Sequence, residues 1–115
     1  MRKDDDVRLR HMLDHSKQAI EYSKGKTRRD LDTNELLASA LEYNIIIIGE
    51  AAVNVSKRCQ EDNPTIRWRD ISSMRERLVH MTYPTDPDLI WATIEKDLPS
   101  LISELEKIIS LEKKC

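Results

Sequence analysis

Residues 34–59 read NELLASALEYNIIIIGEAAVNVSKRC, and this stretch decides the fold class. It contains no proline, and strong helix formers precede the four isoleucines at 45–48. A run of four β-branched residues would also suit a buried strand. We favour one helix over 34–59, because no turn signal separates the isoleucines from the helix formers on either side. Thr33 or Asn34 is placed to cap its first turn.

The isoleucine run makes this helix apolar all round, which predicts burial on more than one side. Three neighbouring helices of one small chain would not cover so much apolar surface, so we expect a second copy of the chain to pack there as a homodimer. Gly49 follows the run and costs a helix about 1 kcal/mol relative to alanine. A close approach of another backbone would explain a glycine at this position.

Three more helices are predicted around the central one. Apolar residues recur at helical spacing from about Asp5 to Tyr22, and Gly25 marks the exit of that first helix. A basic connector over 24–32 leads into the central helix. Asn63-Pro64 ends the central helix, since the residue before a proline avoids the helical region.

The third and fourth helices are recognised by their boundaries. Tyr83-Pro84 closes the third helix. Asp86 is a good N-cap and Pro87 a good first residue for the fourth, which Pro99 should kink or interrupt. The apolar face of the third helix consists of Ile71, Met74, Leu78 and Met81.

The composition fits a single all-α domain over residues 1–115, a small bundle of four to five helices. Charged residues make up 35% and hydrophobic residues 39%, a balance that suits helices with one wet and one buried side. Two glycines and four prolines are too few turn-forming residues for a many-stranded sheet. A chain of 115 residues can bury one modest core.

The net charge of −2 argues against a chain that binds nucleic acid over its whole surface, so any RNA contact should be local. Two basic runs could provide it or could simply be solvated. Cys59 and Cys115 lack disulfide or zinc spacing, and the start lacks the apolar stretch of a signal peptide, so we expect a cytoplasmic protein without a membrane anchor. The runs are Lys24, Lys26, Arg28 and Arg29, and Arg67, Arg69, Arg75 and Arg77.

Arg75 and His80 are the residues best suited to chemistry. A guanidinium can neutralise phosphoryl oxygens, and an imidazole can exchange a proton with a ribose 2′-OH or a leaving oxygen, so the pair suits RNA cleavage without a metal. A surface arginine and a capping histidine would look the same. Residues five apart point away from each other on a regular helix, so we expect either a loosened helix near His80 or a second subunit that completes the site.

Other candidate functional residues have weaker support from the sequence. His11 and His15 have the spacing of two metal ligands, but no third ligand is evident, and we expect no metal. No glycine-rich nucleotide loop is present, so no cofactor is expected. Glu50 is a candidate buried acid or the partner of an arginine, and the sequence leaves both open.

The string Arg75-Glu76-Arg77-Leu78-Val79-His80 resembles the Arg-x-x-x-x-His signature of HEPN ribonucleases, and its surroundings resemble the HepT-like proteins among them. The resemblance runs in the same order over nearly the whole chain. The matching context is IIGEAA at 47–52, Trp68-Arg69-Asp70-Ile71, Met74-Arg75, Thr85-Asp86, Ile90-Trp91 and Asp97-Leu98-Pro99.

This resemblance implies a homodimeric HEPN bundle with a metal-independent endoribonuclease site in the dimer cleft. It also implies the toxin of a type VII-like toxin–antitoxin pair, which an MntA-like nucleotidyltransferase antitoxin neutralises by adenylylation. The catalytic arginine and histidine correspond to Arg75 and His80. Glu50, Glu76 and Arg77 are then supporting or RNA-contacting residues, as are Thr82 and Tyr83.

Two positions depart from the family pattern. Glu76 stands where the family usually has an amide or a similar polar residue, and its charge would not help to bind phosphate. The tyrosine that the antitoxin modifies usually follows the histidine by two residues, but Thr82 stands there and Tyr83 comes next. The alternative function is therefore a non-catalytic helical scaffold that binds a nucleotidyltransferase. A four-helix electron or metal carrier is disfavoured, because the chain lacks paired Glu-x-x-His motifs.

Overall fold

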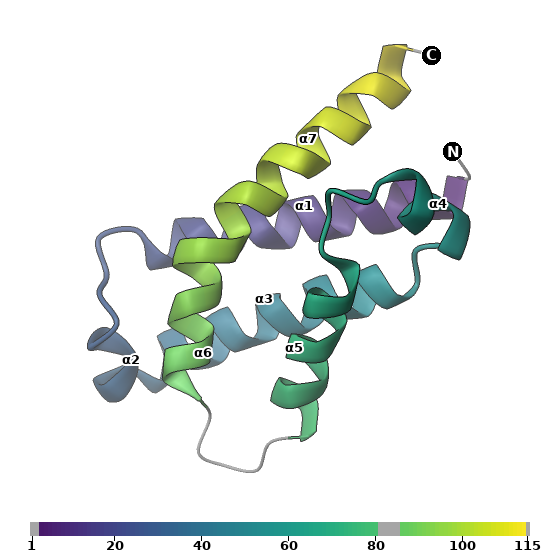
Figure 1. Cartoon of the computed structure of the whole chain (residues 1–115). Helices are drawn as coiled ribbons and strands as arrows, with labels where there is room; N and C mark the ends of the chain where they lie inside the picture. Colours follow the sequence, from purple (N-terminus) through teal and green to yellow (C-terminus); the bar gives the residue numbers. More distant parts are fainter. Residues whose placement is uncertain (1–2, 81–85, 115) are drawn as a thin grey trace.

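A computed structural model describes residues 3–80 and 86–114, with side chains as far as Ser110 (Figure 1). All regular structure in these residues is helical, which confirms the all-α class. The elements are α1 (Lys3–Ser23), α2 (Asp30–Thr33), α3 (Glu35–Val53), α4 (Lys57–Asp62), α5 (Trp68–His80), α6 (Pro87–Ala92), the π-helical turn η1 (Thr93–Asp97) and α7 (Leu98–Lys114).

The α3 helix is the centre of the molecule. It lies antiparallel to α1 and packs against α5 on another side, while α7 packs across α1 (Figure 1). The α6 helix, η1 and α7 follow one another without a break, so the chain has four long helical segments and two short ones within its described part. This matches the predicted bundle of four to five helices.

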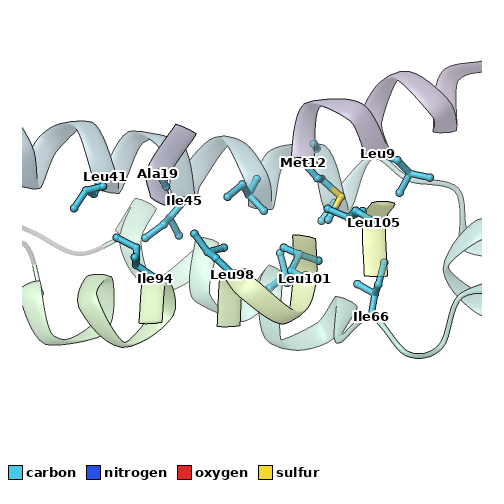
Figure 2. Close-up of a cluster of buried hydrophobic side chains, with 14 of the residues drawn as sticks. Leu9, Met12, Ala19, Leu41, Ile45, Ile66, Ile94, Leu98, Leu101 and Leu105 are labelled. Atoms are coloured by element: carbon cyan, nitrogen blue, oxygen red, sulfur yellow. The ribbon is translucent and has the colours of Figure 1, made fainter. Parts of the chain in front are cut away.

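The buried side chains of α1, α3 and α7 meet in one core (Figure 2). Two of the four isoleucines, Ile45 and Ile48, are almost completely buried, whereas Ile46 and Ile47 are only partly covered. In α1, Val7 is exposed and Leu9 occupies the core instead. The isoleucine run therefore forms a helix, as expected, and part of its apolar surface remains uncovered by this chain.

Two predicted helix starts are confirmed by their caps. The Leu37 amide donates to the Asn34 side chain at 3.0 Å, and the Leu89 amide donates to the Asp86 side chain at 3.1 Å. Pro87 is the first residue of α6, where its missing N–H costs nothing. Each cap satisfies a backbone donor that the first helical turn leaves free.

The prediction of one helix over 34–59 is wrong at its end. The α3 helix stops at Val53, and α4 begins at Lys57 with Ser56 as its N-cap. The Ser56 amide and hydroxyl both donate to the carboxylate of Asp5, at 2.8 and 2.7 Å. This long-range contact joins the start of α1 to the turn, and no local pattern could show it. The predicted connector over 24–32 likewise contains the beginning of α2.

The expected disturbance at Pro99 occurs just before it. Residues Thr93–Asp97 form the π-helical turn η1, and α7 then continues through the proline. Proline cannot donate to the carbonyl of the preceding turn, so a widened turn is one way to keep the helix running. The Thr93 hydroxyl, buried at this point, donates to the Leu89 carbonyl oxygen at 2.7 Å.

By length and composition α3 could also cross a membrane, with a mean hydropathy of 1.5 over its most apolar window. Central helices of soluble proteins meet the same criterion. Packing against α1 and α5 accounts for the apolar residues on the buried side of α3, which is the simpler explanation.

The crossing of α3 and α5 depends on Gly49. A methyl group at Gly49 would overlap the Cβ atom of Arg75 and lie 2.7 Å from its Cγ atom. The predicted close backbone approach at this glycine is therefore confirmed, and the residue that makes it is Arg75.

We expect Gly49→Ala to destabilise the protein by about 1–3 kcal/mol, because α5 must move away from α3 to make room. Helix propensity alone would give the opposite sign, since alanine is favoured over glycine within a helix by about 1 kcal/mol. Urea unfolding followed by circular dichroism measures the change. A variant as stable as the parent would show that α5 does not need this contact.

Candidate active site

Arg75 is held by a carboxylate from the neighbouring helix. Its Nε and Nη2 atoms donate to Oε1 of Glu50 at 3.2 and 2.7 Å, from α5 to α3. Hydrogen bonding to Glu50 raises the pKa of the Arg75 guanidinium above its ordinary value. The Glu50 side chain is 43% exposed, so of the two roles left open the structure supports the arginine partner and not the buried acid.

Glu76 bridges the two predicted catalytic residues. Its Oε1 atom accepts a hydrogen bond from Nη1 of Arg75 at 2.7 Å, and its Oε2 atom lies 3.1 Å from Nε2 of His80. The α5 helix stays regular through His80, so the expected loosening does not occur in this described stretch. Although the two residues are five apart, the side chains of Arg75 and His80 both reach the carboxylate of Glu76, which lies between them in the chain.

The side chains of His80, Glu76 and Arg75 differ in how much of their surface is exposed. His80 is 72% exposed and Glu76 52%, whereas Arg75 is 21% exposed. The site is therefore a surface feature with one mostly covered cation, Arg75, at its base.

Arg77, the other described residue of the predicted site, is not part of this cluster. Nη2 of Arg77 lies 3.8 Å from a carboxylate oxygen of Asp86, so Arg77 faces the start of α6. Thr82 and Tyr83, the predicted modification position and its neighbour, lie outside the described residues, as does Met81.

A groove of about 550 Å³ runs along the other flank of α5, between this helix and the α6–η1–α7 segment. Its floor is apolar and includes Ile71, Met74 and Leu101. No local sequence pattern indicates this groove, because its two walls come from different segments of the chain. Its charged residues are Arg67, Arg77 and Lys96 together with Asp70, Asp97 and Glu104, so it offers polyanions no net attraction.

The histidines of α1 have separate surroundings. His15 Nδ1 lies 2.8 Å from Oδ1 of the buried Asn44, whose amide nitrogen donates to the Ala40 carbonyl oxygen. His11 is exposed. Among the described side chains, no three of His, Cys, Asp or Glu come together as metal ligands.

The first basic run serves contacts within the chain at two of its positions. The Arg28 side chain donates to Asp32 at 2.9 Å and to Asp88 at 2.6 Å, which ties α2 to the start of α6. The hydrogen bond to Asp32, and to a smaller extent the one to Asp88, raises the pKa of the Arg28 guanidinium. Lys24 pairs with Glu21 at 3.2 Å. For Arg28, which joins two segments of the chain, the structure favours a structural role over RNA contact.

The chain is similar to several curated ribonuclease-like proteins of archaea and bacteria. It is 36% identical over 109 residues to a protein of Methanocaldococcus jannaschii named "Gamma-glutamylcyclotransferase and putative RNase", covering 95% of this chain but only 49% of that relative. It is 32% identical to a "Putative RNase" of Caldanaerobacter subterraneus subsp. tengcongensis over 91% of this chain and 94% of the relative. A "Probable ribonuclease HepT" of Thermococcus cleftensis is 31% identical over 84% and 91%.

No solved structure gives a significant match to this chain. The family model described as "Ribonuclease HepT-like" matches residues 12–108, which span all of the helices from within α1 to within α7. The resemblance drawn from the Arg75–His80 string is thus confirmed over most of the sequence, and the chain belongs to the HepT-like ribonuclease family.

Proposed function

We propose that this protein is a metal-independent endoribonuclease whose site consists of Arg75 and His80. The observation that carries the proposal is that both side chains contact one anionic group, the Glu76 carboxylate, at 2.7 and 3.1 Å. Two cationic or proton-bearing groups around one anion are the arrangement that a scissile phosphate needs. The names of the relatives, which include a probable ribonuclease HepT, support the same activity.

In the proposed reaction the guanidinium of Arg75 neutralises the non-bridging phosphate oxygens and the charge that grows on them. Neutral His80 takes the proton of the adjacent 2′-OH while the 2′ oxygen attacks phosphorus. The bond from phosphorus to the 5′ oxygen breaks, and that oxygen takes a proton from water or from an imidazolium. The products are a 2′,3′-cyclic phosphate and a free 5′-OH.

A homodimer is part of the proposal. Leu36 and Tyr43 are 81% and 59% exposed, and together with Glu50 they lie at seven-residue steps along one face of α3. An exposed apolar stripe thus leads along the central helix to the partner of Arg75. If a second copy covers this stripe, two Arg75–His80 sites come to lie near one cleft, and water is partly excluded from both.

We further propose that the protein acts as a cytoplasmic toxin controlled by a nucleotidyltransferase antitoxin of the MntA type. A bulky, negatively charged adenylyl group beside the site would block RNA and repel its phosphates. The rival proposal is a non-catalytic scaffold that binds such a partner. The observation that favours this rival is Glu76, since the two groups needed for cleavage are already engaged by a carboxylate.

RNA cleavage should persist in EDTA and fall by about 10²-fold or more in Arg75→Ala and in His80→Ala, since each removes charge stabilisation or proton transfer. Arg58→Ala and His11→Ala are the matched controls, because both side chains are exposed and lie on α4 and α1, outside the Glu76 bridge and both basic runs. Gel assays of a labelled RNA measure the rates. Activity that needs a divalent ion, or that survives both site variants, would exclude the proposed mechanism, whereas a folded parent without any activity would favour the scaffold.

The protein should sediment as a dimer at micromolar concentration, and Tyr43→Arg should shift it to a monomer with an unchanged helical signal. The reason is that a charged side chain in the middle of the α3 stripe cannot be buried against a second copy. Val7→Arg is the control, because Val7 is an exposed apolar residue of α1 away from the stripe. A parent chain that remains monomeric would rule out the composite cleft.

Adenylylation should be poor or absent in the chain as it stands, and Thr82→Tyr should create an efficient acceptor. Position 82 lies seven residues after Arg75, so a continued helix would bring both to the same face. Intact mass after incubation with an MntA-like enzyme, ATP and magnesium reports the modification. Efficient labelling of the unaltered chain at Tyr83 would show that the acceptor register is different.

A further inference from the structure

The space between Arg75 and His80 is already filled by a negative group. One Glu76 carboxylate oxygen accepts from Nη1 of Arg75 and the other lies beside Nε2 of His80. A phosphate group has a similar spacing between its oxygens and binds guanidinium in the same way as a carboxylate does. Glu76 therefore takes the place that an RNA phosphate would need.

The two carboxylates around Arg75 differ in how firmly they are placed. Glu50 comes from α3, beside Gly49, and one of its oxygens accepts from the Nε and Nη2 edge of the guanidinium across the helix crossing. Glu76 belongs to α5 itself, is half exposed, and its two contacts are with residues one and four positions away. Exposed ion pairs of this local kind contribute about 0–1 kcal/mol each, so Glu76 can swing into solvent at small cost.

Arg75 keeps its orientation when Glu76 leaves. An arginine has five N–H groups, and Glu50 engages only Nε and Nη2. The Nη1 edge released by Glu76 then faces the side where His80 lies. The departure of one carboxylate would thus expose a ready anion site without any movement of α5.

We propose that Glu76 is an internal competitor of the RNA phosphate, which must displace it from Arg75 and His80 before cleavage. This inference rests on the proposed ribonuclease function and adds a regulatory element to the same site. Glu76 then sets the affinity for RNA and the KM, and it keeps the site closed to weakly bound anions.

The test is the binding of a short 2′-O-methyl RNA, which has the phosphates but cannot be cleaved because it lacks the attacking hydroxyl. Glu76→Gln should bind it about fivefold or more tightly than the parent, since two exposed ion pairs no longer compete. Glu61→Gln is the control, because it removes the same charge from an exposed position on α4. That variant should change affinity by less than about twofold. Fluorescence anisotropy at fixed salt gives both constants.

A double variant shows whether the gain arises at this site. Arg75→Ala should weaken binding, and adding Glu76→Gln to it should restore little, because the competitor has lost its partner. Circular dichroism confirms that each variant keeps its helices. A Glu76→Gln effect no larger than that of Glu61→Gln, or equally large without Arg75, would reduce the role of Glu76 to general charge.

Weaker binding by Glu76→Gln would overturn the proposal in the other direction, since Glu76 would then position Arg75 and His80. The binding test does not depend on cleavage. The ribonuclease proposal has its own test: cleavage that Arg75→Ala and His80→Ala leave unchanged would exclude it, whatever the anisotropy shows. If neither the parent nor Glu76→Gln binds the probe, the anion site itself is refuted.

Discussion

The rest of the structure depends on the close contact between Gly49 of α3 and Arg75 of α5. Only a residue without a side chain allows the two helices to approach until the Arg75 Cβ and Cγ atoms rest on the α3 backbone. The next residue of α3, Glu50, then reaches the guanidinium and fixes its direction. One crossing thus sets the packing of α5 and the position of the main cation of the site.

Around this cation the protein places two carboxylates with different consequences. A partner on another helix orients the guanidinium and leaves when the helices part, whereas a partner on the same helix competes with an incoming anion. Because Glu76 bridges Arg75 to His80, it also brings into one contact network two residues whose spacing would otherwise separate them. His80 is 72% exposed, so a second subunit that covered it would shield the site from water.

The two flanks of α5 differ in their chemistry. The flank toward α3 carries the Arg75 cluster and continues into the exposed apolar stripe of Leu36 and Tyr43, which suits an interface. The opposite flank forms a groove with charges of both signs, in which Arg77 lies apart from the site residues. Arg77 and Arg75 are only two residues apart, and helical geometry sends them to different surfaces.

The sequence by itself determined the helical class, two of the caps, the need for a close approach at Gly49 and the identity of the family, because caps, periodicity and short motifs are local properties. It did not determine where α3 ends, since the Asp5 carboxylate that holds Ser56 comes from the far end of α1. Nor did it choose between the roles of Glu50 or show that Glu76 joins Arg75 to His80. Those outcomes depend on which helix crosses which and on how far long side chains reach, and only the tertiary structure decides them.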